Sequence, residues 1–450
     1  MTPSEPLGED RLGALLDVAL GVEGADEVEA VARRRWGGLC RFARSAIHQH
    51  VDADDTTISV RVAVGGRVGT AVTNGVSADG VAAAATTAVA RARVTPPDPQ
   101  WPGTAPAAPL PRVRGRFDEA TAAASPQRRA EAAAALVGRL RAGQEAAGAV
   151  ATTASEVAVA TTAGARHHAL TTRAAISTVV MGPGSSGHAE DAAIGLDGVD
   201  PAALGEEAAS TCERSTDPGD VEPGVMEVVL GPSAVMTLME WLALTTFSAK
   251  AQQEGRSAFA ERMGEAVASE LVSIADDPVA DGVIGLPFDD EGTPCATVEL
   301  IRDGVATGVV HDRATAAAAG VAPTGQGLPA PNPWGPLARH LVLEPGGAST
   351  EDLVAGVDRG LYVTRFWYTR AVNPKQTRVT GMTRDGTFRI EDGRLGPPVR
   401  NLRFNESILD ALASCDGVGS TLRTCSDELG DTRVPALRLR RFSFTAVSDH

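Results

Sequence analysis

Hydrophobic and polar residues alternate along this chain with two different periods, and each period predicts one kind of element. Residues 57–64 and 67–73 carry apolar side chains at every second position on both sides of Gly65-Gly66, which predicts a β-hairpin with a tight turn. Helical spacing of apolar residues runs from 12 to 20, and strand-like alternation follows from 25 to 31. The chain is therefore expected to begin with a helix that leads into a sheet.

The rest of the first half continues this mixture of helices and strands. Residues 77–93 form an alanine-rich helical pattern, and residues 95–112 hold too many prolines for a helix or a strand. A second helix is predicted over 125–144, with Ser125 as its cap and Pro126 at the first helical position. Strands are expected at 151–162 and 166–180.

The second half has shorter apolar runs and more turns. A strand at 226–230 is followed by a helical stretch that extends to about 252, and residues 296–301 and 305–311 alternate as a hairpin. Further strands are expected at 360–368, 387–391 and 434–444. A turn-rich segment at 217–220 separates this β-rich half from the first half.

These elements predict an α+β protein in two parts. The first part is an α/β N-terminal region, residues 1–218, which includes the proline-rich crossing at about 95–112. The second part is a β-rich C-terminal domain, residues 219–450. A chain of 450 residues exceeds the size of one ordinary hydrophobic core, which agrees with this division.

Charge and cysteine usage narrow the class of protein. The formal net charge of -16 argues against a polyanionic partner, so no nucleic acid is expected. Five scattered cysteines without a CxxC pair fit a reducing compartment better than a disulfide framework. Neither a signal peptide nor an apolar run of about 20 residues is visible, so we expect a cytoplasmic protein that makes no membrane contact.

Three segments of the second half carry a family resemblance. They are the strand-Gly-Pro-Ser-helix unit at 226–244, the sequence Leu-Pro-Phe-Asp-Asp-Glu-Gly at 286–292, and Thr-Gly-Gln-Gly at 324–327. Together with residues 39–49 in the first half, they resemble the TldD/PmbA family over nearly the whole chain. The resemblance implies a two-part fold assembled as a heterodimer around an internal cavity, in which the TldD-like partner is the metalloprotease and binds zinc.

The metalloprotease subunit of that family carries an HExxxH motif on the helix after the strand, completed by a downstream cysteine. Aligned by eye, the two histidine positions fall on Met239 and Leu244 of this chain, and the glutamate falls on Glu240. Neither side chain at the histidine positions supplies the imidazole nitrogen that zinc prefers, so we expect no metal and no catalytic residue in this chain. Met239 also belongs to an apolar stripe that predicts core packing, and Cys425 is interpreted as a free thiol.

The acidic run Asp289-Asp290-Glu291 has two interpretations. Its composition favours a turn whose charges are solvated, and no EF-hand pattern accompanies it. The family resemblance instead implies that this loop lies near the internal cavity and shapes access of the substrate. On that basis the expected substrate-binding or cavity residues are Phe288, Asp289, Asp290, Glu291, Thr324 and Gly325.

The leading functional expectation is a TldE-like (PmbA-like) subunit without catalysis of its own. By this resemblance it pairs with a TldD-like zinc metalloprotease and helps enclose unfolded peptides for proteolysis or leader trimming. An alternative is a TldD/TldE-like pair that acts on a small amide- or peptide-containing metabolite in natural-product biosynthesis. A third is a homodimeric protein that only sequesters peptides.

Overall fold

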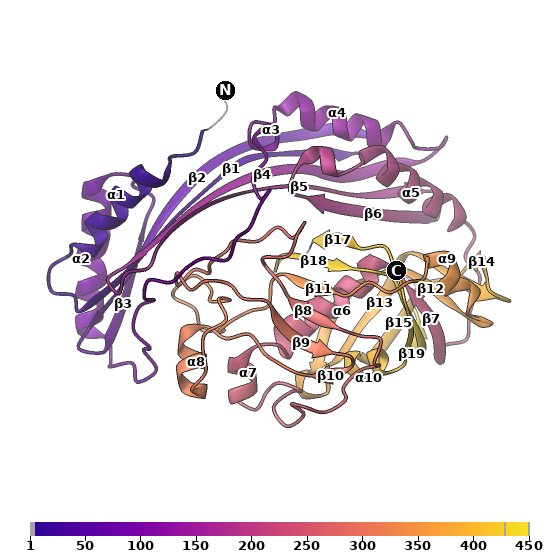
Figure 1. Ribbon diagram of the computed structural model, residues 1–450. Coiled ribbons are helices and arrows are strands. Elements are labelled where there is room, and N and C mark those ends of the chain that lie inside the picture. Colours follow the sequence, from indigo (N-terminus) through magenta and orange to yellow (C-terminus); the bar gives the residue numbers. More distant parts are fainter. Residues whose placement is uncertain (1–4, 427–428, 449–450) are drawn as a thin grey trace.

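The computed structural model describes residues 5–426 and 429–448, and its first sheet forms a curved shell over the rest of the molecule (Figure 1). The strands of this sheet are β1 (Glu27–Ala43), β2 (Ala46–Val64), β3 (Arg67–Thr73), β4 (Glu145–Thr161), β5 (Arg166–Gly182) and β6 (Ser185–Ala193). They pair in the order β3-β2-β1-β4-β5-β6, and every pair is antiparallel. In Figure 1 the four long central strands arch over the C-terminal half.

The first sheet is built from two copies of one pattern, in which three strands are followed by a helix. The first three strands lead into α2 (Ala78–Val94), and the last three lead through the short 3-10 helix η1 (Leu196–Gly198) into α5 (Pro201–Arg214). Each helix packs on the last strand of its own unit, on the outer face of the sheet (Figure 1). The same outer layer contains α1 (Glu9–Leu20), α3 (Glu119–Ala122) and α4 (Pro126–Val137).

The C-terminal half contains two mixed sheets. The strands of the larger sheet are β7 (Val225–Leu230), β12 (Arg359–Asn373), β13 (Arg378–Glu391), β14 (Arg394–Pro398), β15 (Leu402–Ser407), β16 (Cys415–Val418) and β19 (Leu437–Val447). They follow the order β12-β7-β19-β15-β13-β14, with β16 paired to β19. Because β12 also pairs with β13, the path from β12 through β7, β19 and β15 to β13 closes into a ring.

The smaller C-terminal sheet carries the loops that face the first sheet. Its strands are β8 (Ile274–Asp276), β9 (Val298–Arg302), β10 (Val305–Ala306), β11 (Leu341–Leu343), β17 (Arg423–Ser426) and β18 (Asp431–Val434), in the order β10-β9-β8-β11-β18-β17. The helix α6 (Pro232–Thr245) contacts strands of both sheets. The remaining helices are α7 (Ala249–Gln253), α8 (Arg313–Ala319), α9 (Thr350–Ala355), α10 (Ile408–Ala413) and the 3-10 helix η2 (Pro374–Gln376).

The structure confirms the α+β class and most elements predicted from the alternation of residues. The hairpin around Gly65-Gly66 is the β2–β3 pair, and Ser77 and Ser125 cap α2 and α4 by accepting hydrogen bonds from backbone N–H groups. The proline-rich crossing at 95–112 contains neither a helix nor a named strand. No helix of the described chain is long and apolar enough to cross a membrane.

Other predicted elements were wrong in extent. The helix expected over 125–144 ends at Val137, because Gly138 caps it and β4 begins at Glu145. The helical stretch expected to reach 252 is two helices, α6 and α7, since the chain leaves helical geometry at Thr246. The second strand of the 296–311 hairpin has only two residues, and β6 and α5 were not predicted at all.

Candidate functional site

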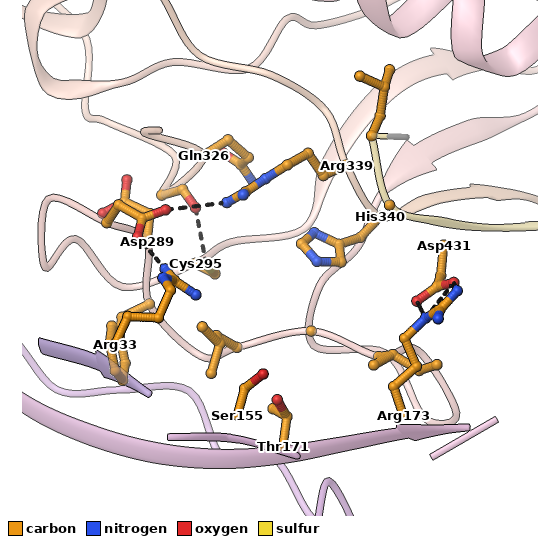
Figure 2. Close-up of a pocket in the computed structure, with 18 of the residues that line it drawn as sticks. Arg33, Ser155, Thr171, Arg173, Asp289, Cys295, Gln326, Arg339, His340 and Asp431 are labelled. Carbon is orange, nitrogen blue, oxygen red and sulfur yellow. Dashed lines mark hydrogen bonds and ion pairs between the residues drawn. The ribbon is translucent and has the colours of Figure 1, made fainter. Parts of the chain in front are cut away.

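A cavity of about 400 Å³ lies between the inner face of the first sheet and loops of the C-terminal half. Figure 2 shows Arg33, Ser155, Thr171 and Arg173 projecting from the strands toward the loops. The loops contribute residues 284–290, 325–326, 339–340 and 429–431, together with Cys295. Segments far apart in sequence therefore form the two walls of one cavity.

Strand alternation decides which residues of β1 face this cavity. Val31 packs against Phe288 of the opposite wall, and Arg33 and Arg35 follow it on the same face because successive side chains of a strand point to opposite sides. The intervening Arg34 points to the other face, where its guanidinium binds Asp54. A consecutive run of three arginines thus places two charges inside the cavity and one outside it.

The acidic loop of the opposite wall is buried, so the expectation of a solvated turn was wrong. Asp289, Asp290 and Glu291 are 4%, 4% and 6% exposed. Asp289 accepts hydrogen bonds from the backbone N–H groups of Glu291 and Thr293, both at 2.9 Å, and from Gly327 at 2.8 Å. These bonds tie the 286–292 loop to the 324–327 segment. Burial, reinforced by Glu291, raises the pKa of Asp289 well above its ordinary value.

Two aspartates of the loop wall bind arginines. Asp290 lies between Arg33, which donates to one carboxylate oxygen, and Arg339, whose Nη2 lies 3.7 Å from the other. Asp431 accepts two hydrogen bonds of 2.8 Å from Arg173, one from Nε and one from Nη2. The pairs Arg33–Asp290 and Arg173–Asp431 join the sheet to the loops with charge-assisted bonds. Together with Arg339, they use both oxygens of both carboxylates.

Cys295 and His340 are the two other side chains of the cavity that could act as a nucleophile or a base. The Cys295 thiol lies 2.9 Å from the carbonyl oxygen of Gly325, and burial raises its pKa well above its ordinary value. Burial and the nearby Arg339 lower the pKa of His340 to about 3. A protonated thiol is a poor nucleophile, and a neutral imidazole of such low pKa is a poor base at neutral pH. The pair does not resemble an activated cysteine site.

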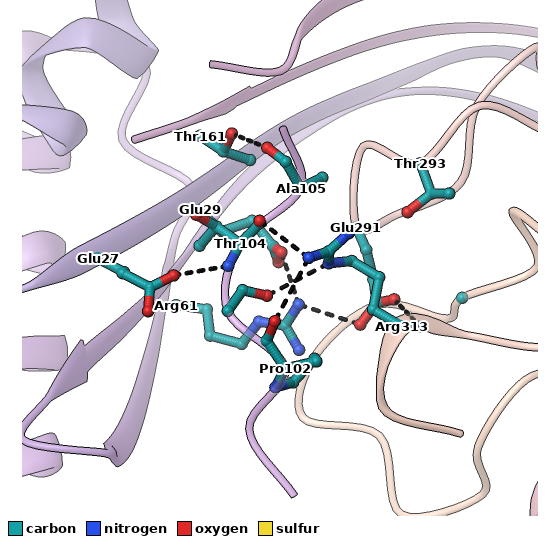
Figure 3. Close-up of polar contacts among 12 residues, drawn as sticks. Glu27, Glu29, Arg61, Pro102, Thr104, Ala105, Thr161, Glu291, Thr293 and Arg313 are labelled. Carbon is teal, nitrogen blue, oxygen red and sulfur yellow. Dashed lines mark hydrogen bonds and ion pairs between the residues drawn. The ribbon is translucent and has the colours of Figure 1, made fainter. Parts of the chain in front are cut away.

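A buried polar network next to the cavity fastens the two halves together (Figure 3). Arg61 on β2 donates to Glu29 at 2.5 Å and to Glu291 of the acidic loop at 3.2 Å. Glu291 also accepts from the backbone N–H of Arg313 at 2.9 Å, and the Arg313 guanidinium donates to the carbonyl of Thr104 in the proline-rich crossing at 3.0 Å. Burial raises the pKa of Glu29, although Arg61 opposes the effect. The network joins the sheet, the crossing and the loop.

The helix α6 does not offer a zinc site at the positions aligned with the family motif. Met239 is fully buried in the main C-terminal core, whereas Leu244 is 40% exposed, so the two side chains do not converge. Cys425 lies farther toward the start of the helix, with its sulfur 3.9 Å from the Ser233 hydroxyl, which donates to Glu190 at 2.8 Å. These residues do not fit zinc, which requires nitrogen, thiolate or carboxylate ligands arranged around one point.

The residues expected from the sequence do not all line one cavity. Glu291 lines a second cavity of about 340 Å³ beside Arg61 and Trp101. Thr324 holds its own loop, because its hydroxyl oxygen accepts from the backbone N–H of His311 at 2.7 Å. Glu240 is partly exposed on α6. The expected residues that line the 400 Å³ cavity are Phe288, Asp289, Asp290 and Gly325.

Sequence reasoning missed the arginines of the cavity. Their signal was present in β1, where a run of arginines interrupts an alternating apolar pattern. Arg173 on β5 and Arg339 in the loop wall had no such signal, because each is a single basic residue that only the tertiary fold brings to the cavity. Within residues 5–426 and 429–448, no group of three or more His, Cys, Asp or Glu side chains is arranged to hold a metal ion.

A curved six-stranded shell, a C-terminal half that contains a closed ring of strands, and a charged cavity between the shell and loops of that half define an α+β protein. The family model "PmbA/TldA metallopeptidase C-terminal domain" matches residues 223–446, and "PmbA/TldA metallopeptidase domain 1" matches residues 28–92. The chain belongs to the PmbA/TldD family.

Individual relatives agree with this assignment. The chain is 31% identical to a metalloprotease of Methanothermobacter thermautotrophicus over 172 residues, which are 38% of this chain and 37% of that protein. It is 29% identical to a metalloprotease TldD homolog of Haemophilus influenzae over 184 residues, 39% of this chain and 37% of that protein. The matches therefore span well under half of the length of these relatives.

Solved structures share the fold over almost the whole chain. The structure of TldE from Thermococcus kodakarensis superposes with a TM-score of 0.89 at 20% identity, covering 97% of this chain and all of that one. A putative modulator of a DNA gyrase from Thermotoga maritima superposes with a TM-score of 0.84, also at 20% identity and with the same coverage. At this identity the likeness establishes the fold alone.

Proposed function

We propose that this chain is a non-catalytic, TldE-like subunit that pairs with a TldD-like zinc metalloprotease and helps enclose unfolded peptides for proteolysis or leader trimming. Family membership and the fold shared with TldE from Thermococcus kodakarensis support the proposal. The observation that carries it is helix α6, where a buried methionine and an exposed leucine occupy the positions aligned with the two histidines of the family motif. Zinc and the catalytic water then belong to the partner.

The first sheet offers one means of holding an extended peptide. β2 pairs with β3 only from Ile58 onward, so residues 46–57 have a strand partner, β1, on one side alone among the described residues. A free strand edge presents backbone N–H and C=O groups that an unfolded peptide can pair with, independently of its sequence. Such pairing suits a subunit that guides many peptides to a partner's active site.

Co-expression with the TldD-like subunit of the same organism tests the proposal. We expect the two chains to co-purify, the pair to contain one zinc per heterodimer by elemental analysis, and the isolated chain to contain none. The pair should digest an unfolded protein such as reduced casein and lose this activity with a chelator. Digestion by the isolated chain that a chelator leaves unchanged would contradict the division of labour.

A second candidate is a pair of this kind that acts on a small amide- or peptide-containing metabolite. The volume of the cavity favours it, because about 400 Å³ lies in the range of small-molecule pockets and holds only a short piece of a peptide. Comparing the turnover of a decapeptide with that of N-acetylated dipeptide amides by the purified pair separates the two candidates. Exclusive turnover of the small amides would favour the metabolite.

A further inference from the structure

Arg35 differs from the other three arginines of the 400 Å³ cavity, each of which is bound to a carboxylate. Within the described part of the chain, Arg35 has no hydrogen-bond or ion-pair partner. Its cross-strand neighbour on β2 is Asp55, which does not line the cavity and makes no ion pair with it. Burial, with the nearby charges of Arg33 and Arg173, lowers the pKa of Arg35. Arg35 keeps part of its surface exposed to solvent, and the charged side chains named beside it, Arg33 and Arg173, are cations like itself.

Two hydroxyl groups stand in a row with Arg35 on the inner face of the sheet. Arg35 is directly opposite Ser155 in the β1–β4 ladder, and Ser155 is directly opposite Thr171 in the β4–β5 ladder. Such cross-strand neighbours have their Cβ atoms about 5 Å apart. Both hydroxyls point into the cavity in Figure 2, and neither makes a side-chain hydrogen bond within the residues described. The row thus carries one unpaired cation and two free donors.

The cavity lining has more arginines than carboxylates, although the chain has a net charge of -16. Its described lining contains four arginines and three aspartates. Asp289 is committed to three backbone N–H groups, and Asp290 and Asp431 are committed to the other arginines. The Arg35 guanidinium, which has no carboxylate partner among the described residues, is therefore the cation of the cavity that remains available to an anion of a ligand.

We infer that the row formed by Arg35, Ser155 and Thr171 binds a carboxylate of the enclosed peptide. The planar guanidinium can donate to both carboxylate oxygens, and the hydroxyls can complete their hydrogen bonding. The carboxylate is either the C-terminal group of the peptide or the side chain of an aspartate or glutamate. This inference deepens the proposed function and rests on it, because it assigns a substrate feature to the cavity that encloses the peptide.

Calorimetric titration of three short peptides into the whole chain tests the inference. The probes are N-acetyl-trialanine with a free C-terminal carboxylate, the C-terminal amide of the same peptide, and N-acetyl-Ala-Glu-Ala amide. We expect the free acid to bind at least about tenfold more tightly than its amide, since hydrogen bonds to a charged group contribute that much. Tight binding of the glutamate peptide as well would assign the site to any carboxylate, and weak binding would assign it to the C-terminus.

Three variants test whether the preference for the free acid over the amide depends on Arg35. Arg35→Ala should abolish the preference for the acid, and Arg35→Lys should restore part of it. Arg41→Ala is the matched control, because Arg41 is an exposed arginine on the same strand outside the cavity, and it should keep the full preference. Thermal unfolding of each variant should match the parent chain, since neither arginine has a partner in the described structure.

Different results would overturn the carboxylate site and the proposed function. Equal affinities of the acid and the amide for the parent chain, or a preference that survives in Arg35→Ala, would overturn the carboxylate site even if the chain co-purifies with its metalloprotease. A carboxylate preference that depends on Arg35 in a chain that forms no pair would support the site and overturn the proposed function.

Discussion

The two halves of the molecule fill their interiors with different side chains. The main core of the C-terminal half holds six of the ten phenylalanines, and Phe366, Phe404, Phe442 and Phe444 contact one another through their rings. The core between the first sheet and helices α1 and α2 consists only of leucine, isoleucine, valine and alanine. The few aromatic residues of the chain are thus concentrated where two sheets and a helix must fill a thick interior.

In the N-terminal half, helices pack closely on strands at glycine positions, and large side chains are few at these contacts. A Cβ atom at Gly69 of β3 would lie 2.2 Å from the carbonyl oxygen of Ala88 in α2, and one at Gly187 of β6 would lie 2.1 Å from that of Ala208 in α5. Both three-strand units therefore seat their helix directly on the last strand. Substitutions that shorten a side chain should therefore lower the free energy of unfolding most in the C-terminal core. Substitutions that enlarge a side chain should lower it most where the N-terminal helices pack on the sheet.

The aromatic cluster should give the largest effect. Phe442→Ala removes a fully buried ring that contacts three others, and we expect a loss of about 4 kcal/mol in the free energy of unfolding. Denaturant titration measures it. Trp334→Ala is the control, because Trp334 is 79% exposed and its loss should cost less than about 0.5 kcal/mol. Equal effects of the two substitutions would contradict the assignment of the core.

The network between the two halves should give the next largest effect. Arg61→Ala leaves Glu29 and Glu291 buried without their shared cation, and we expect a loss of about 3 kcal/mol. Arg128→Ala removes an exposed pair with Asp197 and should cost less than about 1 kcal/mol. Denaturant titration compares both variants with the parent chain. A loss no larger than that of the control would show that the halves are held together by other contacts.

Buried acids of the two halves should respond to pH with opposite signs. Burial raises the pKa of Asp276 on β8 to about 6, so the folded state holds its proton more tightly than the unfolded state. Protonated Asp276 therefore stabilises the folded state below about pH 4. As the pH rises to about 6 this contribution is lost, and the free energy of unfolding falls by at most about 3 kcal/mol relative to Asp276→Asn.

Glu156 on β4 provides the opposite case in the same experiment. Burial alone would raise its pKa, but His168 and the backbone N–H groups of Leu7 and Gly8 lower it. Ionised Glu156 therefore stabilises the folded state at neutral pH, and this contribution is lost as the pH falls through the lowered pKa. Denaturant titrations of Glu156→Gln and Asp276→Asn from pH 3 to pH 7 should therefore diverge from the parent chain in opposite directions. If the free energy of unfolding of both variants changed with pH in parallel with the parent chain, the opposite pKa shifts of Asp276 and Glu156 would be contradicted.

Added volume at the strand–helix contact should give the smallest of these losses. Gly69→Ala forces α2 away from β3, and we expect it to cost about 2 kcal/mol. Gly13→Ala is the matched control, because a Cβ at Gly13 of α1 meets no atom within 4 Å. It should stabilise the chain by about 0.7 kcal/mol through helix propensity. Thermal unfolding distinguishes the two, and stabilisation by both would refute the close contact.

The elements that were predicted correctly are those whose pattern is visible in neighbouring residues. The β2–β3 hairpin combines period-two alternation with a Gly-Gly turn, and α2 begins at a serine cap. β6 escaped prediction because its sequence, Ser-Ser-Gly-His-Ala-Glu-Asp-Ala-Ala, contains no β-branched aliphatic or aromatic residue. It is a strand because it pairs with β5 and supports α5.

The sequence by itself determined the α+β class, the family, and the loop at 286–292 as a distinctive segment. Only the tertiary structure decided that Asp290 is buried between arginines and that Arg35 is left without a partner in the cavity. The reason is physical: the free energy of a charge depends on its burial and on its nearest opposite charge. Here that neighbour lies more than 250 residues away along the chain, as Asp290 does for Arg33 and Asp431 for Arg173.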